Sequence, residues 1–123
     1  MGRKNVLFDT NILIDYLSGI PQARLEMERY SQRAISIITW MEVMAGTTQE
    51  DEKQIRAFLL TFSVQPVTSE VAERAFDLRR QRKIKLPDAI IQATAQVEDR
   101  LFITRNTRDF PCDDPDIRIP YKL

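Results

Sequence analysis

The stretch of sequence that decides the fold reads Asn5-Val6-Leu7-Phe8-Asp9-Thr10-Asn11-Ile12-Leu13-Ile14-Asp15. Its apolar run over residues 6–8 is short and bounded by polar residues, which is typical of a strand buried on both faces. Apolar residues return from Ile12 onward, so we expect a helix from Thr10 to about Ser18. Asp9 would then stand at the carboxyl end of a strand, the edge where open α/β sheets bind their ligands. The alternative is that Asp9 or Thr10 only caps the helix.

Length and composition limit the class of protein. The chain has 123 residues, enough for one domain over residues 1–123, and its 43% hydrophobic and 29% charged residues are typical of a globular domain. Basic and acidic residues balance, so no overall charge attracts nucleic acid or a membrane. No apolar run is long enough to span a membrane and no export signal precedes the first strand, so we expect a cytoplasmic protein. A single cysteine, Cys112, excludes an internal disulfide.

Two absences from the composition narrow the chemistry. The chain has no histidine, which excludes serine–histidine and cysteine–histidine catalysis and histidine-based zinc sites. Its glycines, at positions 2, 19 and 46, form neither a P-loop nor a dinucleotide-binding turn. Carboxylates remain, and carboxylates work most readily through a hard cation such as Mg²⁺ or Mn²⁺.

Apolar runs and helical patterns alternate along the rest of the chain. We expect further strands over residues 34–38, 63–67 and 101–104, and a short edge strand over 117–119. Helices are expected from Pro21, from Thr39, over about residues 49–60, over about 68–81, and from Pro87. The helix from Thr39 is indicated by a capping box with Glu42, and the helix over 68–81 should bury Phe76. Strands separated by helices predict βαβ units and a mostly parallel sheet.

Acidic or amide side chains stand at the ends of several expected elements. Asp9 ends the first strand, and Glu42 follows the second. Asp88 lies in the first turn of the helix from Pro87, while Asn106 and Asp109 follow the fourth strand. In a doubly wound sheet the strand ends and the starts of the following helices share one rim, so we expect these side chains to converge. Converging carboxylates repel one another unless a divalent cation neutralises them.

Each acid by itself also has a purely structural explanation. In this alternative, Glu42 does no more than complete its capping box, and Asp88 does no more than interact favourably with the dipole of its helix. Asp109 would then serve only to cap a turn. The joint placement of all these positions is harder to explain by capping alone. Three further acids are expected on solvated helix faces without a functional role: Asp15, Asp77 and Asp99.

Four blocks of the sequence resemble the PIN-domain ribonucleases, and especially the short VapC-type toxins of bacterial toxin–antitoxin pairs. The blocks are Val6-Leu7-Phe8-Asp9-Thr10-Asn11, Ser36-Ile37-Ile38-Thr39-Trp40-Met41-Glu42, Leu86-Pro87-Asp88-Ala89-Ile90-Ile91-Gln92-Ala93-Thr94-Ala95 and Ile103-Thr104-Arg105-Asn106-Thr107-Arg108-Asp109-Phe110. They follow one another in the order of the family and cover nearly the whole chain. The interval between the second and third blocks is short for the family, which indicates a trimmed helical region.

The resemblance implies both a fold and an activity. The fold would be α/β, a PIN-like three-layer α/β/α arrangement with a mostly parallel sheet of four to five strands. The activity would be Mg²⁺-dependent hydrolysis of RNA, with Mn²⁺ as a substitute. Asp9 and Asp88 would be the main metal ligands, Glu42 the third acid, and the fourth catalytic position would be Asp109, Asn106 or a water. The implied partners are RNA and a cognate antitoxin, with no membrane. Exposed apolar residues on the early helices could form the face of a homodimer or a groove for the antitoxin.

Polar and basic residues near these acids are expected to support them. Thr10, Asn11 and Thr104 could position carboxylates or substrate through hydrogen bonds. Five basic residues fall within positions 79–85, just before Asp88. The residues that could hold the RNA backbone are Arg79, Arg82, Lys83, Lys85, Arg105 and Arg108. The alternative for the run over 79–85 is a solvated helix end that interacts with the helix dipole.

Two other functions compete with the nuclease. A phosphoacceptor receiver domain has a similar size and a strand-end aspartate, but it needs an acid after its third strand and a strand-end lysine, and both are missing here. A non-catalytic PIN-like module that binds RNA or a protein is kept open by the amide at Asn106. The presence of Asp9, Glu42 and Asp88 argues against it.

Overall fold

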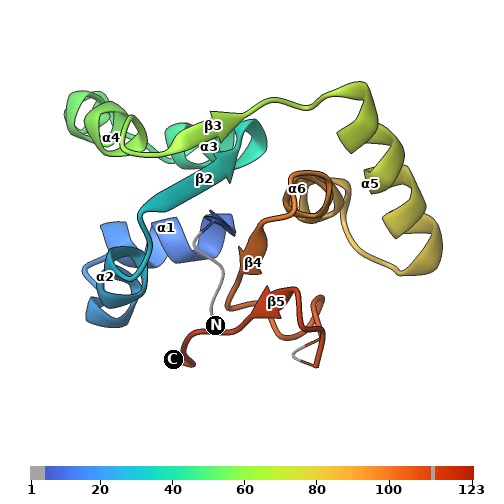
Figure 1. Cartoon of the computed structure of the whole chain (residues 1–123). Helices are drawn as coiled ribbons and strands as arrows, with labels where there is room; N and C mark the ends of the chain where they lie inside the picture. The colour runs from blue at the N-terminus through green and yellow to red at the C-terminus, as the bar shows by residue number, and fades with distance from the viewer. Residues whose placement is uncertain (1–4, 112) are drawn as a thin grey trace.

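Parallel strands build a single sheet within residues 5–111 and 113–123, the part of the chain that the computed structural model describes. The strands are β1 (Asn5–Phe8), β2 (Gln32–Ser36), β3 (Ser63–Gln65), β4 (Leu101–Ile103) and β5 (Ile117–Arg118) (Figure 1). Their spatial order is β3-β2-β1-β4-β5, and every neighbouring pair is parallel. The parallel sheet and the edge position of β5 confirm the expectation. The segment that bears on an export signal, residues 1–4, and Cys112 lie outside the described residues.

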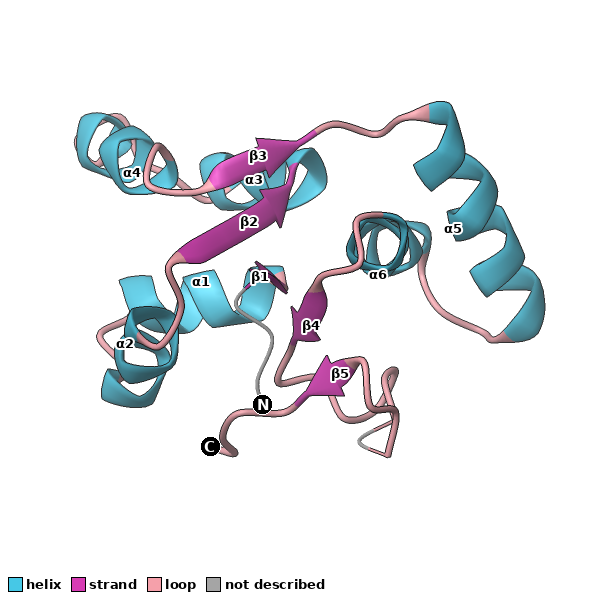
Figure 2. Ribbon diagram, in the orientation of Figure 1, coloured by secondary structure: helices cyan, strands magenta, loops and turns pink. Residues whose placement is uncertain are grey.

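Helices connect these strands and cover both faces of the sheet. They are α1 (Thr10–Leu17), α2 (Pro21–Glu28), α3 (Ile37–Ala45), α4 (Glu52–Leu59), α5 (Ser69–Gln81) and α6 (Leu86–Val97) (Figure 2). Among the described residues, no helix combines the length and the apolarity that crossing a membrane requires.

The central strand β1 explains the layering, because successive side chains of a strand point to opposite faces. Val6 and Phe8 pack in a core with residues of α1 to α4, whereas Leu7 packs in a second core with Ile91 of α6. All three side chains are fully buried. A strand covered on both faces needs an apolar residue at every position, and this is the pattern of residues 6–8. The three-layer α/β/α fold is therefore confirmed.

Two helices begin elsewhere than the sequence predicts. Helix α3 begins at Ile37 instead of Thr39, because the side chain of Ser36 caps it by accepting a hydrogen bond from the Ile38 backbone N–H at 3.0 Å. The expected strand over 34–38 is accordingly Gln32–Ser36, and Glu42 lies beyond the first turn, where it completes no capping box. Short apolar runs such as Ile37-Ile38 do not distinguish strand from helix by themselves.

Helix α4 also starts later, at Glu52 rather than near residue 49. The Thr48 side chain and Asp51 hydrogen-bond to each other and form a turn ahead of the helix, with Thr48 Oγ1 accepting from the Asp51 N–H at 3.3 Å.

The helix α5 packs on α6 instead of on the sheet. Val71, Ala75 and Leu78 of α5 are buried against α6, where Ala89 and Ala93 permit close approach. In Figure 1 the helix α5 accordingly lies beyond α6, at the right of the molecule. Phe76 was expected in this contact but is 53% exposed, because it follows Ala75 by one residue and so points about 100° away around the helix.

Candidate active site

One pocket, of about 320 Å³, lies at the carboxyl edge of the sheet and combines residues from four parts of the chain. Asp9 follows β1, Glu42 comes from α3, Asp88 from the first turn of α6, and Asn106 from the loop after β4. The pocket is lined by Asp9, Thr10, Asn11, Ile14, Glu42, Asp88, Arg105 and Asn106. The order of connection reverses between β1 and β4, so this is the topological switch point where ligands bind in open α/β sheets.

Asp9 is the most enclosed acid of the pocket, with 4% of its surface exposed. Its Oδ1 accepts from the Thr10 backbone N–H at 2.8 Å, so it does cap α1. Its Oδ2 accepts from the Thr104 hydroxyl at 2.7 Å and from the Asn11 amide at 3.2 Å. Burial nevertheless dominates over these donors and raises the pKa of Asp9 to about 6, and the charges of Asp88 and Glu42 add to the rise.

Glu42 is oriented by two threonine hydroxyls. The Thr10 hydroxyl donates to Glu42 Oε1 at 2.7 Å and lies 2.9 Å from the hydroxyl of Thr39. A hydroxyl has one proton, and Thr10 gives its proton to Glu42, so Thr39 donates to Thr10. Thr39 is fully buried and lies one turn before Glu42 on α3. Its hydroxyl therefore fixes the Thr10 hydroxyl that donates to Glu42. The sequence pattern predicted only a capping role for Thr39, at the start of the helix.

Asp88 and the last block face each other across the pocket. Burial raises the pKa of Asp88, and repulsion from Asp109 and Glu42 raises it further, while Lys85 opposes the rise. Asp109 itself is not part of the pocket lining. Its Oδ2 accepts from the Asn106 amide at 2.9 Å, and its backbone N–H donates to Asn106 Oδ1 at 3.2 Å. Of the two candidates for the fourth catalytic position, Asn106 is therefore the one that reaches the pocket, with Asp109 behind it.

The acids line the pocket, but their carboxylates do not meet closely enough to form a complete metal site. Among the described residues, no three acidic or cysteine side chains are close enough together to enclose a metal ion by themselves. Mg²⁺ does not require such a cage, because it commonly uses one or two carboxylates together with water and substrate phosphates. The oxygen-only donor set suits this type of ion, so the residues fit the cation that the sequence analysis expected.

Two of the expected RNA-binding arginines have structural partners instead. Arg82 donates to the Asp109 carbonyl at 2.9 Å and to the Gln92 side chain, and its guanidinium lies 5.7 Å from the Phe110 ring centre. Arg79 donates through Nε to the carbonyl of Ile84 at 3.1 Å. Arg82 thus links the last block to α6, a structural role that the basic run does not reveal.

The remaining basic residues are better placed to meet substrate. Lys83, Lys85 and Arg108 are exposed, and Lys85 lies close enough to Asp88 to affect its pKa. Arg105 lines the pocket itself.

Comparison with known proteins agrees with this geometry. The PIN domain family matches residues 6–111. This chain belongs to the PIN-domain family. It is 32% identical to the ribonuclease VapC10 of Mycobacterium tuberculosis over 114 residues, which cover 86% of each chain. It is 32% identical to the ribonuclease VapC19 of the same organism over 124 residues, which cover 94% of this chain and 98% of VapC19.

A solved structure is similar to this PIN-domain protein over almost its whole length. A chain in a toxin–antitoxin complex from Klebsiella pneumoniae is 47% identical and superimposes with a TM-score of 0.92, covering 97% of this chain and 100% of that one. The PIN-like fold and the VapC type that the four sequence blocks indicated are thus confirmed.

Asp15 was expected to be solvated, and that expectation is wrong. Only 5% of its surface is exposed, and its two carboxylate oxygens accept from Arg105 at 2.7 and 2.9 Å. Tyr121 donates to the same carboxylate at 2.8 Å. These partners lie 90 and 106 residues away in sequence, so no local pattern could reveal them. Asp77 is exposed on α5 as expected, and Asp99 is also exposed but lies in a turn beyond the end of α6.

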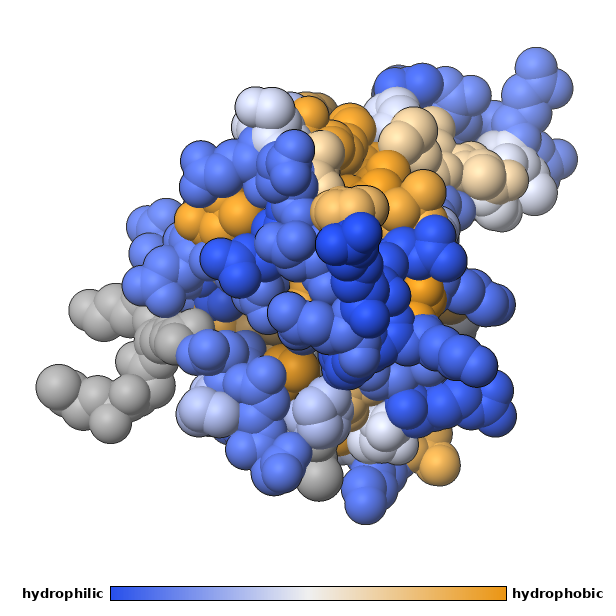
Figure 3. Space-filling model, turned by 90° about the vertical axis from the view of Figure 1, so that its right-hand side faces the viewer, coloured by the Kyte–Doolittle hydropathy of each residue, from blue (hydrophilic) through white to orange (hydrophobic). Residues whose placement is uncertain are grey.

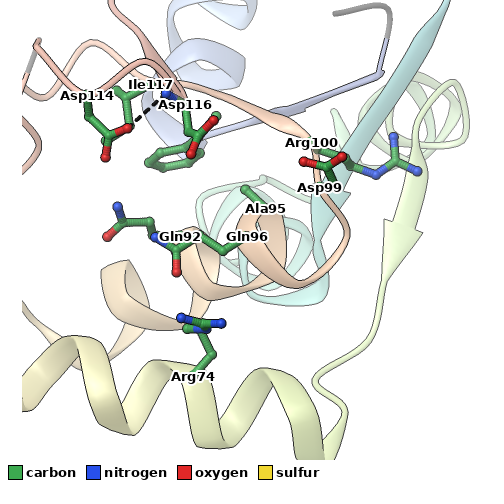
Figure 4. Close-up of a pocket in the computed structure, with 10 residues that line it drawn as sticks. Arg74, Gln92, Ala95, Gln96, Asp99, Arg100, Asp114, Asp116 and Ile117 are labelled. Carbon is green, nitrogen blue, oxygen red and sulfur yellow. Dashed lines mark hydrogen bonds between the residues drawn. The ribbon is translucent and has the colours of Figure 1, made fainter.

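A further pocket, of about 290 Å³, lies near the opposite end of β4 (Figure 4). Its polar lining is largely engaged with neighbouring protein groups. The Gln92 side chain accepts from Arg82, Arg100 pairs with Glu98 at 2.7 Å, and Asp114 accepts from the Asp116 N–H. None of Asp9, Glu42 and Asp88 lines it, and we assign it no part in the chemistry.

Proposed function

We propose that this PIN-domain protein is a metal-dependent endoribonuclease that hydrolyses RNA phosphodiester bonds as the toxin of a toxin–antitoxin pair. The observation that carries the proposal is the convergence of Asp9, Glu42 and Asp88 on one pocket at the carboxyl edge of the sheet. The similarity to two VapC ribonucleases and to a chain of a toxin–antitoxin complex supports the substrate class and the toxin role.

Asp9 and Asp88 would hold Mg²⁺, for which Mn²⁺ would substitute, with Glu42 as the third acid. When bound, the ion would stabilise charge on the scissile phosphate and favour ionisation of the attacking water. Each of these acids is held by its own hydrogen bonds or position: Asp9 by Thr104 and Asn11, Glu42 by Thr10, and Asp88 by the first turn of α6. This order keeps the oxygens in place before substrate arrives, which lowers the cost of organising them.

Glu42 is the best candidate to orient the attacking water. It is exposed at the mouth of the pocket, and the Thr10 hydroxyl occupies its Oε1, so its Oε2 remains to accept a proton from water. Asn106 lines the same mouth and would position the phosphate or complete the ligand set through its amide. Asp109 would act through Asn106, whose amide it holds.

RNA would approach the pocket along basic side chains next to Asp88. Lys83 and Lys85 lie on the loop between α5 and α6, and Arg108 lies on the loop after β4. These contacts to phosphate would provide affinity without choosing a sequence. Replacing Lys83 and Lys85 together by alanine should reduce the slope of the logarithm of RNA affinity against the logarithm of salt concentration. The expected reduction is about 0.7 for each phosphate contact that is lost.

The antitoxin would bind an apolar cleft next to the acidic pocket. The cleft, of about 420 Å³, is lined by residues of α1, α3 and α4 that include Ile14, Leu17, Val43 and Ile55. Ile14 and Leu17 are 44% and 38% exposed, and Ile14 also lines the acidic pocket. An apolar helix face in this cleft would bury them and extend over the pocket, which explains how binding would suppress cleavage.

A second copy of the chain would cover the outer face of α5. Phe76, Leu86 and Val67 are 53%, 50% and 41% exposed there, and Figure 3 shows an apolar area among polar side chains on this side of the molecule. Helix α5 carries acids in its first half and arginines in its last turn, so two antiparallel copies would match opposite charges. Light scattering of wild type and Phe76→Asp should show a dimer for wild type and a monomer for the variant.

Cleavage of a panel of structured RNAs, tRNA included, tests the proposed activity. Wild type and Asp88→Asn would be assayed with Mg²⁺, with Mn²⁺ and with EDTA, and Asp77→Asn would serve as a control because Asp77 is an exposed acid. Metal-dependent cuts that Asp88→Asn abolishes and Asp77→Asn retains are the expected result. Absence of cleavage by folded wild type in every condition would favour a binding module instead.

A further inference from the structure

Arg105 links the acidic pocket to the inner face of α1. Its backbone N–H donates to Asn11 Oδ1 at 3.1 Å, and the Asn11 amide in turn donates to Asp9. Its side chain donates through Nε and Nη2 to Asp15 at 2.7 and 2.9 Å. Asn11 and Asp15 are one helical turn apart, so a single residue of the last block holds two successive turns of α1.

The carboxylate of Asp15 is in turn fixed by Tyr121. The tyrosine hydroxyl donates to Asp15 Oδ2 at 2.8 Å, and its ring packs against the core formed with α1 to α4. Burial and the hydrogen bond to Asp15 raise the pKa of Tyr121, so the hydroxyl keeps its proton at any ordinary pH. The donor is therefore permanent, and Asp15 accepts three hydrogen bonds in one fixed orientation.

This arrangement keeps the Arg105 side chain at the pocket, partly exposed. Nε and Nη2 donate to Asp15, and the Tyr121 hydroxyl lies close enough to the guanidinium to interact with it as well. The side chain is 33% exposed and lines the pocket with Asp9 and Glu42. Because Asp15 neutralises its charge, Arg105 would contribute a directed hydrogen bond more than a long-range attraction.

We propose that Asp15 and Tyr121 are positioning residues that hold Arg105 at the mouth of the acidic pocket, where its guanidinium binds a phosphate of the RNA. The inference rests on the proposed ribonuclease function and adds a role for the chain around residue 121, outside the four sequence blocks. Tyr121 would act on substrate binding through Asp15 and Arg105, without touching RNA.

A second cluster in the molecule has the same three residue types, an arginine, a buried acid and a tyrosine, but lies outside the acidic pocket. Arg118 donates through Nε and Nη2 to the buried Glu26 at 2.6 and 3.0 Å, and Tyr30 donates to Glu26 at 2.9 Å. The chemistry is the same as in the Asp15 cluster, but none of the three residues lines the acidic pocket. Removing the Tyr30 hydroxyl therefore measures the structural cost of losing such a hydrogen bond, without an effect on substrate.

The test compares Tyr121→Phe with Tyr30→Phe, and Arg105→Gln and Arg105→Lys with Arg118→Gln, in steady-state RNA cleavage. Thermal unfolding gives the folded fraction of each variant. We expect Tyr121→Phe to raise KM several-fold with little change in kcat, and Arg105→Gln to lower kcat/KM by about 10- to 100-fold, the range for one hydrogen bond to a charged group. Arg105→Lys should recover part of this loss, because it keeps a cationic donor.

The control variants Tyr30→Phe and Arg118→Gln should lower the unfolding temperature and leave KM unchanged. If Tyr121→Phe and Tyr30→Phe have the same KM and differ only in stability, the positioning role is refuted while the nuclease stands. If Arg105→Gln cleaves RNA with the KM of wild type, the contact to phosphate is refuted. Wild type that cleaves no RNA refutes the proposed function itself, an outcome that the wild-type arm separates from the other two.

Discussion

Asp9 and Glu26 are buried to the same extent, at 4% exposed each, yet their surroundings differ in charge. Glu26 accepts two hydrogen bonds from Arg118 and one from Tyr30, and Asp15 has the equivalent set from Arg105 and Tyr121. Asp9 receives neutral donors, and within the described part of the chain no basic side chain forms an ion pair with it.

We propose that this difference separates acids that stabilise the fold from acids that would bind a cation. Glu26 and Asp15 each accept two hydrogen bonds from an arginine, which supplies the opposite charge, whereas burial without such a partner raises the pKa of Asp9 to about 6. The missing positive charge would come from the metal ion. The following experiments test whether the two groups of acids behave in opposite ways.

The largest expected effect is that of Asp9→Asn on cleavage. Loss of one oxygen ligand should lower kcat by roughly 10³-fold, comparable to removing a group that stabilises the transition state. The same variant should be more stable than wild type in EDTA, by about 1–2 kcal/mol, because a buried uncompensated charge disappears. Cleavage assays and urea unfolding would measure the two effects, and a variant that loses both activity and stability would break the distinction between the groups.

Glu26→Gln should show the reverse behaviour. Arg118 would lose its carboxylate while still one-third exposed, so we expect about 2–3 kcal/mol of lost stability, below the range for fully buried pairs. The folded protein should cleave RNA with the KM of wild type, because Glu26 lies outside the acidic pocket. Urea unfolding followed by assays corrected for the folded fraction would check this. A changed KM would mean that the Arg118 cluster is not a purely structural element.

The pH dependence of stability should expose Asp9 directly. A carboxyl group whose pKa rises from 3.8 to about 6 on folding favours the folded state below pH 3.8, and this contribution disappears as the pH rises through 6. The full effect is on the order of 3 kcal/mol. In EDTA, the stability difference between Asp9→Asn and wild type should therefore be larger at pH 7.5 than at pH 4.5. Equal differences at both pH values would contradict the raised pKa.

The sequence predicted the position of a site residue correctly where an acid directly follows a recognisable strand or stands at the start of a recognisable helix. Asp9 and Asp88 follow from the apolar run over 6–8 and from the start of α6, because these patterns place them at the carboxyl edge of the sheet. Glu42 was placed correctly but for a wrong reason, since Ser36 and not Thr39 caps α3. The capping role of Asp9 and its place in the pocket are both real, so the two alternatives do not exclude each other.

Long-range pairs were the main source of error. Asp15 was assigned to solvent because its partners Arg105 and Tyr121 are distant in sequence, and the direction in which a helix presents one acid depends on how the helix packs. The structural role of Arg82 was missed for the same reason, because its contacts with Asp109 and Gln92 are formed only in the folded chain. A charge run alone does not tell which members remain free for a ligand.

The most direct test of the central claim is thermal unfolding against Mn²⁺ concentration at pH 7.5, for wild type, Asp9→Asn and the exposed-acid control Asp77→Asn. If Asp9 awaits a cation, wild type and Asp77→Asn gain stability with each addition of Mn²⁺, as mass action requires for a ligand that binds the folded state. Asp9→Asn should start higher and respond little. A wild-type curve that does not move with Mn²⁺, or an Asp9→Asn curve that moves as much as wild type, would contradict the claim.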